Sequence, residues 1–253
     1  MNFSVVLIVR NEASTIEGCL KSVKNFSDDI IVIDGFSTDD TVKIAKKYTN
    51  KIFFVKPKGY TEPFREFGVS KAKHGWILNL DADERITQEL KKEIRQKTEE
   101  GEFDAFYIPR KNFFLGHWIR LSYPDYQLRL YKKGAVRFTS DIHAGLHPVK
   151  KAGKIRNALL HYSYRSWEQL EERRDRTSTI EAENLSKKIN AGTFDMIKYF
   201  FIKPAVIFLY YLILRGGFKN GRGDIIFCFD NLLYNISIAE KAFMMKEENT
   251  NFS

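Results

Sequence analysis

Apolar and polar residues alternate in blocks along the first part of the chain. Apolar runs occupy residues 3–9, 30–33, 51–56 and 76–80, and a polar turn follows each of them. Between these runs, residues 13–23, the stretch after Thr41, and residues 64–73 space their apolar side chains as amphipathic helices do. Strands and helices that alternate in this way predict an α/β fold with a Rossmann-like, mostly parallel sheet. Ligands of such sheets bind beyond the carboxyl ends of the strands.

The second half of the chain predicts a helical, amphipathic C-terminal extension. Residues 167–189 have helical spacing and mixed charge, and residues 224–241 predict a largely apolar helix. The most apolar run, residues 196–215, is interrupted by Lys203 and Pro204, which leave about eleven residues where a membrane crossing needs about twenty. We therefore expect a helix that lies on an anionic membrane surface, with a buried helix or an oligomer interface as the alternative. The predicted domains are residues 1–192 and 193–253.

Composition sets the class of protein. With 253 residues, 43% of them apolar and 14% aromatic, the chain can bury a substantial core and is not a disordered protein. Cys19 and Cys228 provide no disulfide framework and are expected to be buried in a reducing compartment. The first residues lack the pattern of a secretory signal peptide, so we expect a cytoplasmic location, at the inner face of the cell membrane.

The net charge of +9 is concentrated in one segment. Residues 105–165 carry 12 basic side chains, against the acids Asp125 and Asp141 alone. Such a field attracts anionic partners, for example phosphorylated glycans or anionic lipids, although a solvated basic surface is the simpler alternative. Nucleic acid is not expected as a partner, because the aromatic residues here lie within apolar runs and no nucleic-acid-binding motif is present.

Two carboxylates follow the fourth predicted strand, in the triplet Asp81-Ala82-Asp83. Side chains alternate along an extended chain, so both carboxylates point the same way and the small Ala82 lies between them. Without nearby His or Cys ligands in the sequence, this pair suits Mg²⁺ or Mn²⁺, which complete their coordination with substrate phosphates and water. The alternative is that these acids cap the start of the helix predicted after them.

Three segments together resemble a known family. Residues 4–12 (SVVLIVRNE), 31–41 (IVIDGFSTDDT) and 76–85 (WILNLDADER) resemble the inverting family 2 glycosyltransferases with the GT-A fold. Within that family, the LDADER ending and the basic, aromatic-rich second half are most similar to the lipopolysaccharide-core glucosyltransferases of the WaaE/KdtX type. The resemblance implies a nucleotide-diphosphate sugar as donor, most often a UDP-sugar, and an anionic glycolipid or lipid-linked glycan as acceptor.

The resemblance also implies roles for individual residues. It places the base and ribose of the donor against Val9, Asn11, Glu12 and Asp34. Arg65 would face the phosphates or the base of the donor, with a surface ion pair to Glu62 or Glu66 as the alternative. Asp81 and Asp83 would form the D-x-D pair around Ala82, with Asp83 as the more direct metal ligand. The late histidine, His161, is a candidate for the diphosphate or the metal, or else an ordinary structural histidine.

An inverting transfer also needs a general base on the acceptor side. Asp141 is the only acid between Tyr126 and Tyr164. Relatives of this type read His-Glu where this chain has His143-Ala144, and alanine cannot accept a proton. Three explanations stay open: Asp141 is the base, a Glu has been changed to Ala at 144, or the chain has lost activity. His143 could orient the acceptor or a phosphate, or could simply bind the backbone of its own loop.

The sequence therefore predicts a metal-assisted, inverting glycosyltransferase that acts at the cytoplasmic membrane face. One alternative is a protein or peptide glycosyltransferase of the same fold. Another is a catalytically inactive, basic protein that docks on membranes and binds a nucleotide sugar without transferring it. A homo-oligomer is compatible with all three readings.

Overall fold

The computed structural model of the chain describes residues 1–56, 62–138 and 146–251. These residues form two compact units. The first contains residues 1–111 and 124–161, and the second contains residues 112–123 and 162–253. This division differs from the boundary predicted after residue 192, because the helix that begins at Trp167 packs along the last helix of the chain.

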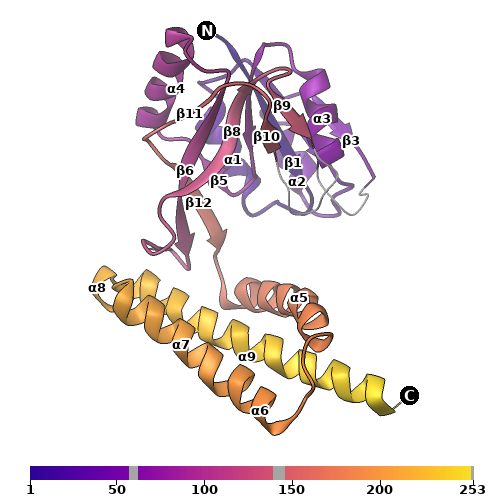
Figure 1. Cartoon of the computed structure of the whole chain (residues 1–253). Helices are drawn as coiled ribbons and strands as arrows, with labels where there is room; N and C mark the ends of the chain where they lie inside the picture. Colours follow the sequence, from indigo (N-terminus) through magenta and orange to yellow (C-terminus); the bar gives the residue numbers. More distant parts are fainter. Residues whose placement is uncertain (57–61, 139–145, 252–253) are drawn as a thin grey trace. The chain divides into compact units, whose positions relative to one another are not determined.

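The first unit is a mixed sheet with helices on its faces (Figure 1). Its strands form the spatial order β3-β2-β1-β4-β8-β6-β12-β5. In chain order, the elements are β1 (Phe3–Val9), α1 (Ile16–Val23), β2 (Asp29–Asp34), α2 (Thr41–Ala45), β3 (Ile52–Phe54), α3 (Glu62–Lys71), β4 (Trp76–Leu80), β5 (Glu84–Arg85), α4 (Gln88–Glu100), β6 (Ala105–Phe114), β8 (Asp125–Lys132), β9 (Val136–Phe138), β10 (Leu146–Pro148), β11 (Ala152–Lys154) and β12 (Leu159–Tyr164). The last residues of β6 and β12, and the short strand β7 (His117–Trp118), belong to the second unit.

The parallel half of this sheet confirms the predicted βα pattern. Strand β1 pairs in parallel with β2 and β4, and β2 pairs in parallel with β3. The register sets Val9 opposite Asp34, so the loops after β1 and β2 leave the sheet at the same edge. The other half is antiparallel, since β8 pairs with β4 and with β6. The sequence did not predict this antiparallel half.

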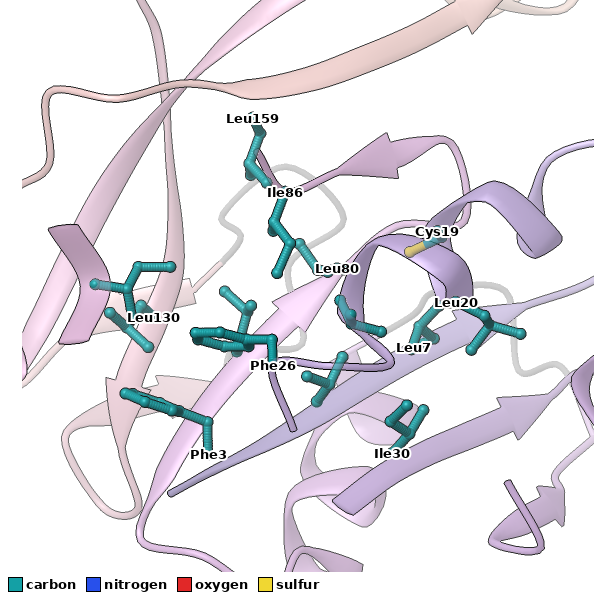
Figure 2. Packing of buried hydrophobic residues seen from close by; sticks show 14 of the residues in the cluster. Phe3, Leu7, Cys19, Leu20, Phe26, Ile30, Leu80, Ile86, Leu130 and Leu159 are labelled. Atoms are coloured by element: carbon teal, nitrogen blue, oxygen red, sulfur yellow. The ribbon is translucent and has the colours of Figure 1, made fainter. Parts of the chain in front are cut away.

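Alternation along β1 shows why the central strands are apolar throughout. Phe3 and Leu7 face one core cluster, together with Cys19 and Leu20 of α1, as Figure 2 shows. Val6 faces a second cluster on the opposite side of the sheet, to which α3 contributes Phe64. A strand with both faces covered needs apolar residues at every position, which is the pattern that predicted it.

The second unit is built from helices (Figure 1). They are α5 (Trp167–Ser186), α6 (Thr193–Met196), the π-helix η1 (Ile197–Ile202), α7 (Lys203–Leu209), the π-helix η2 (Tyr210–Leu214), α8 (Gly217–Asn220) and α9 (Arg222–Asn251). Both α5 and α7 pack against α9. Cys228 is buried in this unit and Cys19 in the first, and both are free thiols, as predicted.

One prediction about this unit is wrong. Lys203 and Pro204 do not interrupt the apolar run, because a single helix continues through them from Thr193 to Leu214. Pro204 sits in the first turn of α7, directly after the π-helix η1. The turns of a π-helix are wider than those of an α-helix and leave room for the proline ring. At the start of α7 the N–H that proline lacks is not required. The resulting 22-residue helix is long and apolar enough, by length and composition, to cross a membrane, and only 6% of its most apolar part is buried.

Candidate active site

The loops after β1 and β2 are held together by side-chain hydrogen bonds. Asn11 lies in the left-handed backbone region, with φ of 56°, which asparagine tolerates better than most residues. Its backbone N–H donates to Ser37 Oγ at 2.8 Å, and its Oδ1 accepts from the backbone N–H of Thr38 at 2.8 Å. Asp34 is fully buried and accepts from the backbone N–H of Ser37 at 2.8 Å and from its hydroxyl at 2.6 Å. Asn11 and Asp34 thus belong to one rigid loop pair.

Glu12 lies between this loop pair and the acidic triplet. Its backbone N–H donates to Thr41 Oγ1 at 2.7 Å. Burial raises the pKa of its carboxyl group, and the nearby carboxylates of Asp83 and Asp81 add to the rise, while a hydrogen bond from Thr15 opposes it. The negative charges of the triplet therefore act on Glu12.

The two carboxylates of the triplet have different surroundings. Asp81 pairs directly with Arg129, and its Oδ1 lies 3.4 Å from Nη2 of Arg65. Burial would raise the pKa of Asp81, but Arg129 and Arg65 together hold it well below its usual range. Asp81 is therefore ionised and engaged with guanidinium groups. Ala82, between the two acids, is buried.

Arg129 and Glu84 extend this ion pair into the interior. Glu84 is completely buried, and its Oε1 lies 2.7 Å from Nη2 of Arg129 and 3.5 Å from Nη1 of Arg110. Its other oxygen accepts from the backbone N–H of Asp81 at 3.0 Å. Two arginines and two acids thus form a hydrogen-bonded network beneath the triplet, which fixes the backbone where the triplet begins.

Asp83 instead faces a histidine. Its Oδ2 lies 3.2 Å from Nε2 of His161, and the two side chains are 26% and 15% exposed. Pairing of β12 with β5, which sets His161 opposite Glu84, brings the late histidine to the triplet. The structure thus places His161 beside Asp83 and Arg65 beside Asp81.

Asp83 and His161 suit a divalent cation that is shared with a diphosphate. Within the residues that the structure describes, no three His, Cys, Asp or Glu side chains converge as a complete metal site. Mg²⁺ and Mn²⁺ at phosphate sites need only one or two protein ligands, because phosphate oxygens and water supply the rest. Asp83 can be such a ligand, with His161 as its neighbour. Asp81 fits this role less well, because Arg129 and Arg65 already occupy its oxygens.

Arg85 stabilises the turn that carries the triplet. Its guanidinium donates to the backbone carbonyls of Ala82 and Glu84, each at 2.8 Å, and to that of Thr15 at 2.5 Å. Gly18 of α1 makes room for it, since a Cβ at Gly18 would lie 2.4 Å from Nε of Arg85. The glycine lets the helix approach the arginine and links α1 to the site.

Other sequence predictions have mixed outcomes. Part of the basic charge between residues 105 and 165 is neutralised inside the first unit, for example by the 2.7 Å pair of Arg110 with Asp125 and the 2.9 Å pair of Lys132 with Asp104. The predicted acceptor-side residues Asp141, His143 and Ala144 lie outside the described residues. Arg129 and Glu84 were not predicted as site residues. The signal was present, because an arginine inside the apolar stretch Leu128–Tyr131 requires a buried counter-ion.

The sheet, with paired loops and an acidic triplet at the carboxyl ends of its parallel strands, defines an α/β protein whose candidate site lies at that edge. Residues 4–154 match the Glycosyl transferase family 2 profile. The chain is 31% identical to an uncharacterized glycosyltransferase of Rickettsia conorii, over 96% of this chain and 92% of that protein, and 33% identical to one of Rickettsia felis, over 96% and 91%. The chain belongs to glycosyl transferase family 2 and has its GT-A fold.

Two more distant similarities cover almost the whole chain. The lipopolysaccharide core biosynthesis glycosyltransferase LpsC of Rhizobium meliloti is 22% identical over 95% of this chain and 91% of its own length. Among solved structures, TarS of S. aureus in complex with UDP-GlcNAc is 15% identical, with a TM-score of 0.48, and the match covers 100% of this chain and 93% of that one.

Proposed function

We propose that the protein transfers a sugar, with inversion, from a nucleoside diphosphate donor to a hydroxyl group of an anionic glycan or glycolipid. A UDP-sugar is the first donor to test. The observation that carries the proposal is the difference between the two acids of the triplet. Asp81 is fixed by Arg129 and Arg65, whereas Asp83 stands beside His161, where it can hold a cation together with the donor's diphosphate.

The donor's nucleoside fits the paired loops after β1 and β2. Val9 ends β1 opposite Asp34, and Asn11 is bonded to the loop that follows Asp34. Amide and carboxylate oxygens at fixed positions suit the hydroxyls of ribose and the edge of a base. Arg65, which approaches Asp81 from α3, adds positive charge near the donor's phosphates. These residues would bind and orient the donor.

Departure of the nucleoside diphosphate builds negative charge on the leaving oxygen. A bound Mg²⁺ or Mn²⁺ supplies Lewis-acid stabilisation of that charge. Asp83 and His161 would hold the ion, and Arg65 would contribute a second positive group. The attacking hydroxyl must lose its proton on the opposite face of the sugar. We assign that step to the segment around His143, either to Asp141 or to a glutamate whose place Ala144 now takes.

An acceptor that carries a lipid is supported by the exposed apolar helix of the second unit. The helix Thr193–Leu214 exposes large apolar side chains, among them Phe201 at 70% and Leu214 at 77%. Lys198 and Lys203 lie on the same helix, where their charges suit anionic headgroups. The name of the relative LpsC also supports a lipopolysaccharide-type acceptor. We propose peripheral contact with the cytoplasmic face of the membrane.

The direct test is donor turnover. The purified full chain is incubated with a panel of nucleotide sugars, with Mn²⁺ or with EDTA, and with or without a truncated lipopolysaccharide core as acceptor. The proposal predicts release of UDP that requires both metal and acceptor. Binding of a UDP-sugar without any release would favour the inactive docking protein, and transfer to peptides but not to glycolipid would favour the protein glycosyltransferase.

A further inference from the structure

A pocket of about 230 Å³ lies between α5 and α9, within the second unit. On α5 it is lined by Leu170, Arg173, Arg174 and Thr177, which occur at spacings of three, one and three residues. This spacing places all four side chains on one face of the helix. That face is the one turned toward α9, where a packed helix pair normally has apolar residues.

The facing stripe of α9 has the same spacing. Phe227, Asp230, Asn231 and Tyr234 line the pocket from that side. Two helices thus present matched stripes to each other, and each stripe contains charged or polar groups where close packing would need apolar ones. The seam is therefore open at this end of the helix pair.

Further along, the same two helices close completely. Ala182 of α5 and Ala242 of α9 are fully buried in one cluster. Nearer the pocket, Ser178 Oγ lies 3.2 Å from Ser237 Oγ, and Ser178 is also fully buried. Helices α5 and α9 therefore pack tightly where their facing residues are small. The pocket is a local opening that results from the larger and more polar residues that line it.

The charged groups of the pocket are held in place and keep further bonding capacity. Nη1 of Arg174 lies 3.3 Å from Oδ1 of Asp230, and these side chains are only 20% and 18% exposed. Burial raises the pKa of Asp230, and Arg174 opposes that rise. A guanidinium has five N–H donors and a carboxylate about four acceptor sites, so the pairs of Arg174 with Asp230 and, at 3.9 Å, with Glu171 leave several of them for a ligand. Partly buried ions of this kind gain from extra hydrogen bonds.

Aromatic rings form the apolar part of the same pocket. Phe114 and Phe227 line it with ring centroids 6.3 Å apart, and Tyr234 contributes a third ring. A ligand with hydroxyls around its edge and an apolar C–H face would contact both kinds of surface. A sugar ring has this character, and a pocket of 230 Å³ is of a size for one ring.

We propose that this pocket binds one sugar ring of a glycan, with its hydroxyls bonded to Asp230, Arg174 and Asn231 and its C–H face on Phe227. The carboxylate of Asp230 and the amide of Asn231 supply acceptors for sugar hydroxyls, which a phosphate cannot use, although Arg173 and Arg174 also give the lining more positive than negative groups. Inorganic phosphate is therefore the rival ligand that the test must include. In the context of the proposed glycosyltransferase activity, the bound ring belongs to the acceptor. The pocket is thus an acceptor-recognition site in the helical unit.

The test measures binding of methyl glycosides to the full chain by saturation-transfer NMR. The glycosides are those of glucose, galactose, N-acetylglucosamine and heptose, and inorganic phosphate is the second probe. At least one glycoside should bind, and Asp230→Asn should weaken it tenfold or more. Asn231→Leu, which keeps the side-chain size, should weaken it at least fivefold. Asp175→Asn is the matched control, because Asp175 of α5, like Asp230 of α9, forms an ion pair between the two helices, with Lys241 of α9 at 2.6 Å, but does not line the pocket.

Three results would overturn this inference: no binding of any glycoside, binding of phosphate instead, or equal losses in Asp230→Asn and Asp175→Asn. Circular dichroism of each variant verifies folding, and Asn231→Leu decides the question if Asp230→Asn does not fold. UDP-sugar binding should be unchanged in both pocket variants. Failure of wild-type donor turnover with intact glycoside binding would contradict the proposed function and leave the pocket assignment standing.

Discussion

Arg129 joins Asp81 to Glu84: its Nη2 pairs with the carboxylate of Asp81 and lies 2.7 Å from Oε1 of Glu84. The arginine itself is almost fully buried, and Glu84 completely so. The first acid of the triplet is therefore part of a buried ionic network. The second acid, Asp83, lies 3.2 Å from His161. Two acids separated by a single residue thus have different partners, and we propose only the second as a metal ligand.

The buried network should be important for stability. Glu84→Gln removes the negative charge that Arg129 and Arg110 share. Arg129 keeps its pair with Asp81 and Arg110 its pair with Asp125, so the cost is the loss of charge-assisted hydrogen bonds, about 1.5–3 kcal/mol. We expect a loss of that order in the free energy of unfolding, measured by urea denaturation with circular dichroism. Glu100→Gln is the control, since the pair of Glu100 with Lys97 at 2.8 Å is on the surface and should change stability much less. Similar losses in the two variants would refute the role of the network.

Glu12 should give the metal-free protein a characteristic pH dependence. Because burial raises its pKa above 4.5, the unfolded chain loses this proton at a lower pH than the folded chain does. Stability therefore falls as the pH rises from about 4.5 through the higher folded value. Glu12→Gln should be more stable than the wild type at pH 7, and the difference should vanish below pH 4.5, where both states are protonated.

Thermal unfolding in EDTA at a series of pH values measures this effect. Glu17→Gln is the control with the opposite sign, because Lys21 and Tyr48 lower the pKa of Glu17. An advantage of Glu12→Gln that persists unchanged at low pH would mean that it arises from packing and not from the carboxylate's ionisation.

The proposed contact with membranes depends on the exposed apolar side chains of the helix Thr193–Leu214. Replacing both Phe201 and Leu214 by Ser should reduce binding to vesicles of anionic phospholipid about a hundredfold or more, because each buried side chain of this size contributes about 1.5–3 kcal/mol. Co-sedimentation with vesicles measures it. Val149→Ser, which changes an apolar residue of the first unit that is 51% exposed, is the control and should bind normally. If the wild-type chain ignores the vesicles, the helix is an interface between proteins.

The acceptor-side base can be tested by restoring it. If Ala144 takes the place of a glutamate, then Ala144→Glu should raise the transfer rate by about a hundredfold to ten-thousandfold, with little change in donor affinity. Asp141→Asn provides the opposing experiment. A wild-type chain that is active, loses its activity in Asp141→Asn and gains nothing from Ala144→Glu would identify Asp141 as the base.

The parallel half of the fold was predictable because each strand has both faces covered. Val6 and Leu7 point into different clusters, so the whole strand had to be apolar, and the run was visible in sequence. The antiparallel strand β8 escaped prediction, because Arg129 and Gln127 break its apolar pattern. The long helix was wrongly predicted to break at Pro204, because the amino-acid composition does not show where a π-helical turn will accommodate a proline.

The sequence indicated some residues of the candidate site, but not the contacts that distinguish them. Alternation indicated that Asp81 and Asp83 point the same way, yet it could not show that Arg129, 48 positions after Asp81, would engage the first of them. His161 was connected to the triplet only through the family resemblance, because the pairing of β12 with β5 spans a long stretch of chain. Contacts between distant strands decide which acid is available, and sequence spacing does not report them.

The most direct test of the proposed site compares Asp83→Asn with Asp81→Asn in donor binding. Isothermal titration calorimetry measures the affinity for UDP-glucose and for UDP-N-acetylglucosamine, once in the presence of Mn²⁺ and once in EDTA. We expect Asp83→Asn to abolish most of the gain in affinity that Mn²⁺ gives the wild type, while its affinity in EDTA stays near the wild-type value. Asp81→Asn should lower thermal stability and keep a large part of the Mn²⁺ gain. Equal affinities of Asp83→Asn and wild type in Mn²⁺ would contradict the assignment of Asp83 as the metal ligand.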